Sequence, residues 1–450
     1  MPNLPDATII ILNWNGKAYL EACLTALLDQ TYKPQEILLV DNASTDDSPA
    51  LVRESFPAVK IIENERNLGY AAGNNAALRQ VDSETAVLVN PDIVAGSDWL
   101  ENLLAPFAAD KMIGIVGSKL LYPGKDQQLQ HAGGLITHPQ AMPAHRGMYE
   151  SDEGQFDEPA DVDFVTGAAI AVRRDVLETA GLLDEGFFMY FEDADWCARA
   201  RRSGFRVVYA PRATAVHDES ATSVRGSASY LRRFHSGRWR YLLKHFAPAE
   251  IINGTLPAET AWLGGIEGAE RRALGWAYRD SIGDFPAIMA ARTQDGAKAI
   301  TQADQDLIIG GLLDLRRAAL LWPDKPAQWQ DLMDAGQVKP RPFTSTVPAA
   351  GPLIARLRDL WASAAAKPYT GALNAQQNEF NLAAAQELQG IENRLRAFAD
   401  VWMRQEEERR ELTWEIAAIQ QELDKAYRSL SRIESRIRNL EEQDGEYDSS

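Results

Sequence analysis

Three carboxylates stand within four positions, directly behind a run of aromatic residues. They are Glu192, Asp193 and Asp195, and the five residues before them read FFMYF. The dipole of a helix favours acids in its first turn, which accounts for one or two of them but not for the aromatic run. A carboxylate beside an aromatic wall suits a partly dehydrated sugar pocket, where it could take the proton from an attacking hydroxyl.

A second candidate follows the apolar run at 85–89, where the chain continues as Asn90-Pro91-Asp92. An acid immediately after a buried strand can present one oxygen to a divalent cation that bridges a diphosphate. The same tripeptide is also an ordinary turn, so both interpretations stay open on this motif alone. His217 follows another apolar run and is either a packed histidine or, near such a cation, a further ligand.

Polar residues and glycines follow the other strand-like runs of the first hundred residues. Asp41 is placed to accept from the ring N–H of a pyrimidine or from ribose, although it could equally cap a turn. Glycines that open a helix let the backbone approach an anion. The candidate nucleotide-binding positions are Asn13, Asn15, Asp41, Asn67, Gly69, Gly73 and Asn90.

The elements that must position these side chains alternate along the chain. Strand-like apolar runs occur at 8–12, 36–40, 59–62, 85–89 and 113–117, with amphipathic stretches between them. This alternation predicts an α/β fold with a parallel sheet covered by helices on both faces. Ligands bind beyond the carboxyl ends of such strands, where the polar residues above lie. A helix is expected from about Glu192 to Gly204, followed by a strand.

The remaining segments differ in character. Residues 124–162 are rich in Gly, Pro, Gln, His and acids, which predicts a long mobile loop. A helical pattern runs from about 228 to 330, and a Pro-rich stretch at 338–352 marks a linker. Over 386–443, apolar residues recur at alternating three- and four-residue spacing, which predicts a coiled coil that joins copies of the chain or docks a partner. A single helix packed on the globular body is the alternative, and strand number and orientation stay open.

The composition excludes some classes of protein. The formal net charge is -18, so the chain would repel nucleic-acid phosphates. The two cysteines, Cys23 and Cys197, have no metal-like spacing, which fits a reducing cytoplasm. We expect the apolar run from Ala7 to Leu12 to be a buried strand rather than a signal peptide, and no run reaches the roughly 18 residues of a membrane-spanning helix. The basic amphipathic segment 230–246 either lies on an anionic membrane or packs on the catalytic domain.

An ordered set of motifs resembles a known family. ATIIILNWNG, ILLVDNASTDDS, NERNLGYAAGNNAAL, VLVNPD, the segment around FFMYFEDADW and AVH occur in that order. Over about residues 7–245, the chain resembles the inverting family-two glycosyltransferases, and among them the bacterial rhamnosyltransferase-like enzymes that build cell-surface polysaccharides. The resemblance implies a GT-A fold, which is a Rossmann-like mixed sheet with helices on both faces.

The resemblance also implies roles for single residues. Asp41 would hold the nucleobase, and Asn90 and Asp92 would stand where the family has its metal-binding Asp-x-Asp motif. His217 would complete the ligands of Mg²⁺ or Mn²⁺, and Asp193 would be the general base. The side chains that would shape the acceptor site are Glu192, Asp195 and Trp196. Position 90 is Asn where many relatives have Asp, so a single carboxylate would hold the cation.

The expected layout is a glycosyltransferase domain at 1–245, a helical extension at 246–337, a linker with a helical segment at 338–385, the coiled coil and a tail at 444–450. The expected partners are a dTDP- or UDP-sugar donor and a glycan or polyprenol-linked acceptor. The protein is expected in the cytoplasm, with peripheral contact at the inner face of the cell membrane. A nucleotidyltransferase would need a Gly-rich, lysine-bearing motif near the first strand, which LNWNG lacks. An inactive transferase-like scaffold that acts through its coiled coil is the other alternative.

Overall fold

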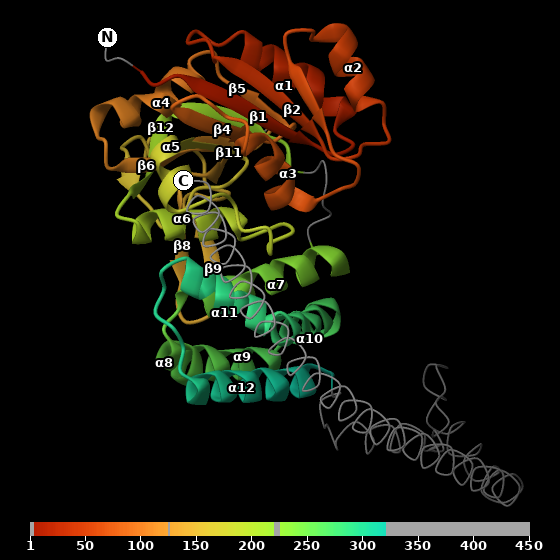
Figure 1. The fold of residues 1–450 in the computed structure, drawn as a ribbon, viewed down its shortest axis with the longest axis vertical. Helices are drawn as coiled ribbons and strands as arrows, with labels where there is room; N and C mark the ends of the chain where they lie inside the picture. The colour runs from red at the N-terminus through yellow and green to blue at the C-terminus, as the bar shows by residue number, and fades with distance from the viewer. Residues whose placement is uncertain (1–3, 125–126, 220–225, 321–450) are drawn as a thin grey trace, which may run out of the picture. The chain divides into compact units, whose positions relative to one another are not determined.

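The first apolar run of the chain forms a strand, β1, inside a ten-stranded sheet (Figure 1). The structure is a computed structural model that describes residues 4–124, 127–219 and 226–320. The order across the sheet is β10-β12-β6-β11-β4-β1-β2-β3, with β5 on β12 and β7 on β6, while β8 and β9 form a separate pair. The strands are β1 (Ala7–Asn13), β2 (Glu36–Asp41), β3 (Lys60–Glu63), β4 (Thr85–Val89), β5 (Ile93–Ala95), β6 (Ile113–Leu121), β7 (Leu129–His131), β8 (Gly134–Thr137), β9 (Met142–His145), β10 (Ala160–Asp161), β11 (Ala169–Arg173) and β12 (Arg206–His217).

The sheet is mixed, so the expectation of a purely parallel sheet is corrected. β1 pairs in parallel with β2 and β4, but β11 lies antiparallel between β4 and β6. A parallel neighbour needs a crossover connection that is usually a helix, whereas the described residues between β6 and β11 contain the strands β7 to β10 and no helix. The predicted α/β class with helices and a mixed sheet is confirmed.

Helices cover both faces of this sheet. Ile9 and Ile11 of β1 pack in one core with apolar side chains of α1 and α4, whereas Gly73 of α3 lies against Leu12 on the opposite face. The alternating direction of strand side chains produces this division. The helices of this part are α1 (Lys17–Leu28), α2 (Ser48–Ser55), α3 (Gly69–Leu78), α4 (Trp99–Ala109), α5 (Arg174–Thr179) and α6 (Glu192–Arg202).

The segment 124–162 is not the mobile loop that its composition predicts. In its described residues it contains β7, β8, β9 and β10. Lys119 of β6 is almost fully buried and pairs with Asp152 at 2.8 Å and Asp157 at 2.6 Å. These ion pairs and strands hold the polar segment against the sheet, a tertiary effect that composition does not reveal.

A layer of helices follows β12 and lies below the sheet in Figure 1, with α7 closest to it. This confirms the helical pattern from 228 as far as Leu320. The elements are α7 (Ala228–His245), α8 (Pro248–Glu250), a π-helical turn at Ile251–Thr255, α9 (Leu256–Leu263), α10 (Gly268–Gly283), α11 (Phe285–Gln294) and α12 (Gln302–Leu320).

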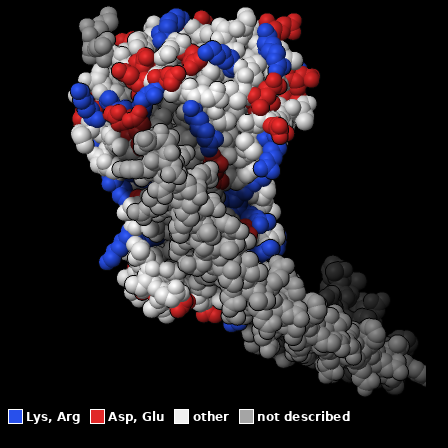
Figure 2. All heavy atoms as spheres, viewed as in Figure 1, with Lys and Arg blue, Asp and Glu red and all other residues white. Residues whose placement is uncertain are grey.

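The basic helix α7 packs on the protein rather than presenting a free cationic face. Arg238 is fully buried and pairs with Glu259 at 2.8 Å, and the buried Lys244 contacts Asp184 at 2.7 Å. Arg232 pairs with Asp280 at 2.9 Å. These paired cations support the alternative in which this segment packs on the domain, and membrane contact stays a prediction. On the face seen in Figure 2, Lys and Arg mix with Asp and Glu instead of forming one basic region.

Among the described residues, no helix has the length and apolar character required to cross a bilayer. Both cysteines are free and buried. The described residues belong to one compact unit, residues 1–320. The predicted linker and the predicted coiled coil at 386–443 lie outside the described residues, and the domain boundaries stay predictions.

Candidate active site

One cavity of about 510 Å³ brings together acids that are a hundred residues apart in sequence. Its lining includes Asn90 and Asp92 from the turn after β4, Glu192 and Asp193 from the first turn of α6, and His217 from the end of β12. The sheet register explains part of this meeting. β5 pairs antiparallel with β12, and Ile93 stands opposite His217. Asp92, one residue before Ile93, therefore lies beside the imidazole.

Asp92 and His217 form a close, buried pair. His217 Nε2 lies 3.3 Å from Asp92 Oδ1, which is a buried oxygen without a hydrogen-bond partner among the described residues. On the other side of the ring, Nδ1 lies 2.6 Å from Oε1 of Gln130. Because that oxygen only accepts, a neutral His217 carries its proton on Nδ1 and keeps the Nε2 lone pair toward Asp92.

This pair fits a divalent cation. A carboxylate oxygen and an imidazole nitrogen suit Mg²⁺ or Mn²⁺, and an unpartnered buried carboxylate oxygen is costly without a ligand. No group of three or more candidate ligands occurs in the part of the chain that the structure describes. Mg²⁺ is commonly held by one or two protein carboxylates together with substrate phosphates, so Asp92 and His217 could hold it with a diphosphate.

Asp193 is held by backbone donors inside the cavity wall. Its Oδ2 accepts from the Gly167 amide at 2.9 Å, and its Oδ1 accepts from its neighbour Ala194 at 2.7 Å. Burial raises the pKa of Asp193 above its ordinary value, while these backbone hydrogen bonds oppose the rise. Tyr70 donates to the Gly167 carbonyl at 2.6 Å and so holds the same residue from its other side. The carboxylate is thus fixed in orientation and more basic than in water.

Glu192 has a different environment. Its Oε2 is buried without a hydrogen-bond partner among the described residues. Burial, and then the charge of Asp193, raise the pKa of Glu192 well above its ordinary value. The pKa of Glu192 is raised more strongly than that of its neighbour Asp193, so a neutral Glu192 beside a charged Asp193 is favoured. Such a pair of unlike carboxyl groups is expected at sites of acid–base chemistry.

The aromatic turn before α6 is conformationally strained. Tyr190 and Phe191 have φ values of 73° and 72°, in the left-handed region that non-glycine residues rarely adopt. Each such residue costs on the order of 1–3 kcal/mol and persists only where its surroundings hold it. Helix α7 packs directly against this turn at Gly237, where a Cβ would lie 2.5 Å from the Tyr190 carbonyl oxygen. This turn leads directly into Glu192 and Asp193, which line the cavity.

Apart from Asn90, which follows β4 and lines the cavity, the candidate nucleotide-binding residues follow β1, β2 and β3. Asn13 and Asp41 are opposite one another in the sheet register, and the Asn13 side chain donates to Asp41 at 3.1 Å. The Ser44 amide donates to the other carboxylate oxygen at 3.0 Å. Asn15 accepts from the Thr45 amide at 2.7 Å. These residues form a polar turn network at one edge but do not line the 510 Å³ cavity.

Asn67, Gly69 and Gly73 lie at the start of α3. Asn67 accepts from the Gly69 amide at 2.9 Å, and Gly69 has a φ of +80°. A Cβ on Gly69 would stand 2.4 Å from the Phe188 carbonyl oxygen, so only glycine fits. Gly73 is in close contact with the sheet, because a Cβ there would lie 2.6 Å from the Cδ1 methyl group of Leu12, which would have to move. Gly73 therefore serves helix–sheet packing in this structure.

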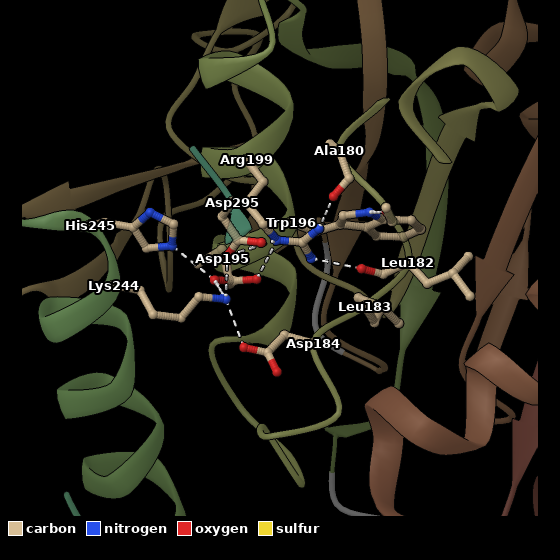
Figure 3. Close-up of polar contacts among 12 residues, drawn as sticks. Ala180, Leu182, Leu183, Asp184, Asp195, Trp196, Arg199, Lys244, His245 and Asp295 are labelled. Atoms are coloured by element: carbon tan, nitrogen blue, oxygen red, sulfur yellow. Dashed lines mark hydrogen bonds and ion pairs between the residues drawn. The ribbon is translucent and has the colours of Figure 1, made fainter. Parts of the chain in front are cut away.

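Two expected acceptor residues are placed elsewhere, and this corrects the sequence-based assignment. Asp195 is fully buried and contacts Arg199 at 2.8 Å and Lys244 at 2.6 Å (Figure 3). Trp196 is also fully buried and donates to the Gly181 carbonyl at 2.9 Å. The α-helical repeat turns both side chains away from the cavity that Glu192 and Asp193 line. Their contacts support α6 instead.

Several cavity residues were missed by sequence reasoning. Gln130 and His131 of β7 and His145 of β9 belong to the segment that was expected to be a mobile loop. His131 Nδ1 lies 2.8 Å from His145 Nδ1, and burial lowers the pKa of His131 well below its ordinary value. A usable signal existed, since residues 124–162 contain three of the six histidines of the chain.

The N-terminal part of the chain matches a family model. Residues 8–181 match the model described as glycosyl transferase family 2, so this part carries a glycosyltransferase family 2 domain. The match includes Asp41 and Asp92 and ends before Asp193 and His217.

Curated relatives match about half of the chain. A protein from Mycobacterium tuberculosis named N-acetylglucosaminyl-diphospho-decaprenol L-rhamnosyltransferase is 26% identical over 262 residues, which are 52% of this chain and 83% of the relative. An uncharacterised protein from Sinorhizobium fredii is 31% identical over 235 residues, which are 49% of this chain and only 25% of that protein. The solved structure of GalNAc-T7 with UDP, GalNAc and Mn²⁺ matches with a TM-score of 0.48 at 14% identity, covering 69% of this chain and 56% of that chain.

Proposed function

We propose that this chain, which carries a glycosyltransferase family 2 domain, is an inverting glycosyltransferase of the GT-A type. It would move a sugar from a nucleoside-diphosphate donor to a hydroxyl of a glycan or lipid-linked acceptor. The observation that carries the proposal is the shared cavity, where Asp92, Asp193 and His217 line one space of about 510 Å³. Donor activation and acceptor activation need separate groups that face the same anomeric carbon, and this cavity supplies both.

Asp193 acts as the general base in this proposal. Its burial makes it a better proton acceptor than an ordinary aspartate, and the Gly167 amide holds it in place at 2.9 Å. It takes the proton of the acceptor hydroxyl while the oxygen attacks the anomeric carbon. Glu192, held neutral by burial and by Asp193, can donate a hydrogen bond to the acceptor. A single displacement of this kind inverts the anomeric centre.

The leaving diphosphate belongs to the other wall of the cavity. A divalent cation held by Asp92 and His217 would stabilise its developing negative charge. Asn13 and Asp41 hold the nucleoside end in this proposal, at the carboxyl ends of neighbouring strands. The donor is proposed to be a dTDP- or UDP-sugar, and rhamnose is favoured because of the rhamnosyltransferase name of the Mycobacterium tuberculosis relative. The decaprenol in that name supports a lipid-linked acceptor at a membrane surface.

Replacing Asp193 by Asn tests this role. We expect turnover to fall by about 10²–10⁴-fold, because an amide cannot accept the proton. Donor affinity, measured by calorimetry with a nucleotide sugar and Mn²⁺, should stay within about twofold. Asp175→Asn is the matched control, since Asp175 is an exposed aspartate in the first turn of α5. Wild-type turnover in Asp193→Asn would remove Asp193 from its role, and a wild-type protein without turnover on any donor would favour the inactive scaffold.

A further inference from the structure

A second cavity, of about 570 Å³, adjoins the candidate active site. Its walls are the segment 186–189, α7, α10 and α11, and we name it the α7–α10 pocket. Met189 lines both this pocket and the active-site cavity. The neighbouring Phe188 is fixed at its backbone, where its carbonyl accepts from the Tyr70 amide at 2.7 Å. A volume of this size is ordinary for a small-molecule site, for which about 300–1,000 Å³ is typical.

Aromatic rings and guanidinium groups face one another across the pocket. The ring of Phe188 is 40% exposed and lies 4.7 Å from the Arg233 guanidinium carbon. The guanidinium carbon of Arg232 lies 5.7 Å from the centre of the Trp276 ring. Stacked guanidinium groups are held in one plane, so their N–H donors keep a fixed direction. The pocket therefore offers apolar faces together with oriented donors.

Most arginine side chains of the pocket already form ion pairs with carboxylates of the protein. Arg232 donates to both oxygens of Asp280 at 2.9 and 3.0 Å, and Ser236 donates to the same carboxylate at 3.3 Å. Arg240 contacts Asp184 at 2.9 Å. Within the described residues, Arg233 has no carboxylate partner, and its contact is the ring of Phe188. No described carboxylate therefore competes with a ligand for the donors of Arg233.

We infer that the α7–α10 pocket is a saccharide subsite, which holds a sugar unit of the acceptor some distance from the hydroxyl that reacts. This inference rests on the proposed glycosyltransferase function. The C–H face of a pyranose packs on aromatic rings, while its hydroxyls exchange hydrogen bonds with groups such as Arg233, Ser236 and Asp280. An acyl chain would cover the Arg233 guanidinium without offering it a hydrogen-bond acceptor, which disfavours a lipid tail as the occupant.

The position of the pocket favours the acceptor over the donor. The candidate nucleoside-binding residues lie at the ends of β1 and β2 and do not line it. Met189 lines both cavities instead, and it belongs to the same aromatic segment that leads into Asp193. A chain of sugars could therefore run from the general base into the α7–α10 pocket.

Saturation-transfer NMR on the full-length protein tests the subsite. The probes are free disaccharides built from N-acetylglucosamine, rhamnose and galactose, with UDP and Mn²⁺ held constant. We expect at least one to bind the wild type and to bind Trp276→Ala about tenfold more weakly, because a stacking face is lost. Ser229→Trp should weaken binding similarly by filling the pocket mouth without removing a packed side chain. Arg272→Ala, an exposed cation on α10, is the control and should bind as the wild type does.

Two results overturn the subsite. One is that no disaccharide binds the wild type, and the other is that both pocket variants bind with wild-type affinity. The release of nucleoside diphosphate to water, which needs no acceptor sugar, is measured on the same proteins. If the wild type releases no nucleoside diphosphate, the result counts against the glycosyltransferase function. If the wild type releases it and both pocket variants bind the disaccharide as the wild type does, the result counts against the subsite alone.

Discussion

Lys244 holds a buried group of carboxylates behind the candidate general base. Its side chain is 1% exposed, and Nζ lies 2.6 Å from Asp195, 2.7 Å from Asp184 and 2.9 Å from Asp295 (Figure 3). These acids come from α6, from the loop before it and from the end of α11. Asp195 is two residues after Asp193 on the same helix. Lys244 therefore ties the helix that carries the candidate base to the helical layer.

Replacing Lys244 by Met removes the charge and keeps the length of the side chain. Removing one partner of a buried ion pair costs about 3–5 kcal/mol. Asp195 keeps Arg199 and Asp184 keeps Arg240, so we expect the lower end, about 3 kcal/mol. The entropy of unfolding is about 2.1 cal/mol/K per residue, which gives roughly 0.7 kcal/mol/K for the 320-residue unit. Dividing the lost free energy by this entropy predicts that Tm falls by about 4–5 °C.

The stability that Lys244→Met loses should also depend on pH. Burial opposes ionisation of Asp195, but the charges of Arg199 and Lys244 hold its pKa well below the ordinary value. A depressed pKa of an acid contributes stability above the unfolded-state pKa of about 3.9, and that contribution fades as pH falls toward the folded-state pKa. The difference in Tm between Lys244→Met and wild type should therefore be largest near neutral pH and shrink below about pH 4.

Calorimetry or fluorescence-monitored melting of the full chain measures these shifts. Lys60→Met is the control, because Lys60 forms an equally short 2.6 Å pair with Glu36 but is 73% exposed. Surface pairs contribute about 0–1 kcal/mol, so the control should lose less than about 2 °C. Equal shifts in the two variants, or a shift of Lys244→Met that does not change with pH, would refute the assignment of the buried charges as the cause.

Three further predictions concern the cavity and the start of α3. Gln130→Leu should weaken Mn²⁺ binding in the presence of UDP by about 10–100-fold, measured by calorimetry, because His217 loses the group that fixes its ring; unchanged affinity would contradict this. Glu192→Gln should raise Tm at pH 7 by removing a buried carboxyl with a raised pKa, at about 1.4 kcal/mol per pKa unit. The gain should fade as pH falls below the unfolded-state pKa of about 4.3, because the carboxyl is then neutral in both states. Gly69→Ala should weaken donor binding at least about tenfold, because its Cβ would press on the Phe188 carbonyl, whereas Gly204→Ala, with similar positive φ but open space around it, should not.

Local pattern was sufficient for much of the fold. The apolar runs at 8–12 and 36–40 became β1 and β2, and the acids after FFMYF begin α6 at Glu192 as expected. These features depend on side-chain periodicity and on helix-end preferences, which act over a few residues. The strand β11 was missed, and so was its antiparallel direction, because pairing direction depends on the path of the chain across the sheet.

The sequence by itself determined which residue types stand at the strand ends, and therefore that carboxylates, amides and a histidine were available for diphosphate and hydroxyl chemistry. Only the tertiary structure decided which of them share a cavity. Asp92 meets His217 through the β5–β12 register, whereas Asp195, two residues from Asp193, faces a buried lysine. The physical reason is that a helix turns neighbouring side chains to different surroundings, while sheet pairing joins residues that are far apart along the chain.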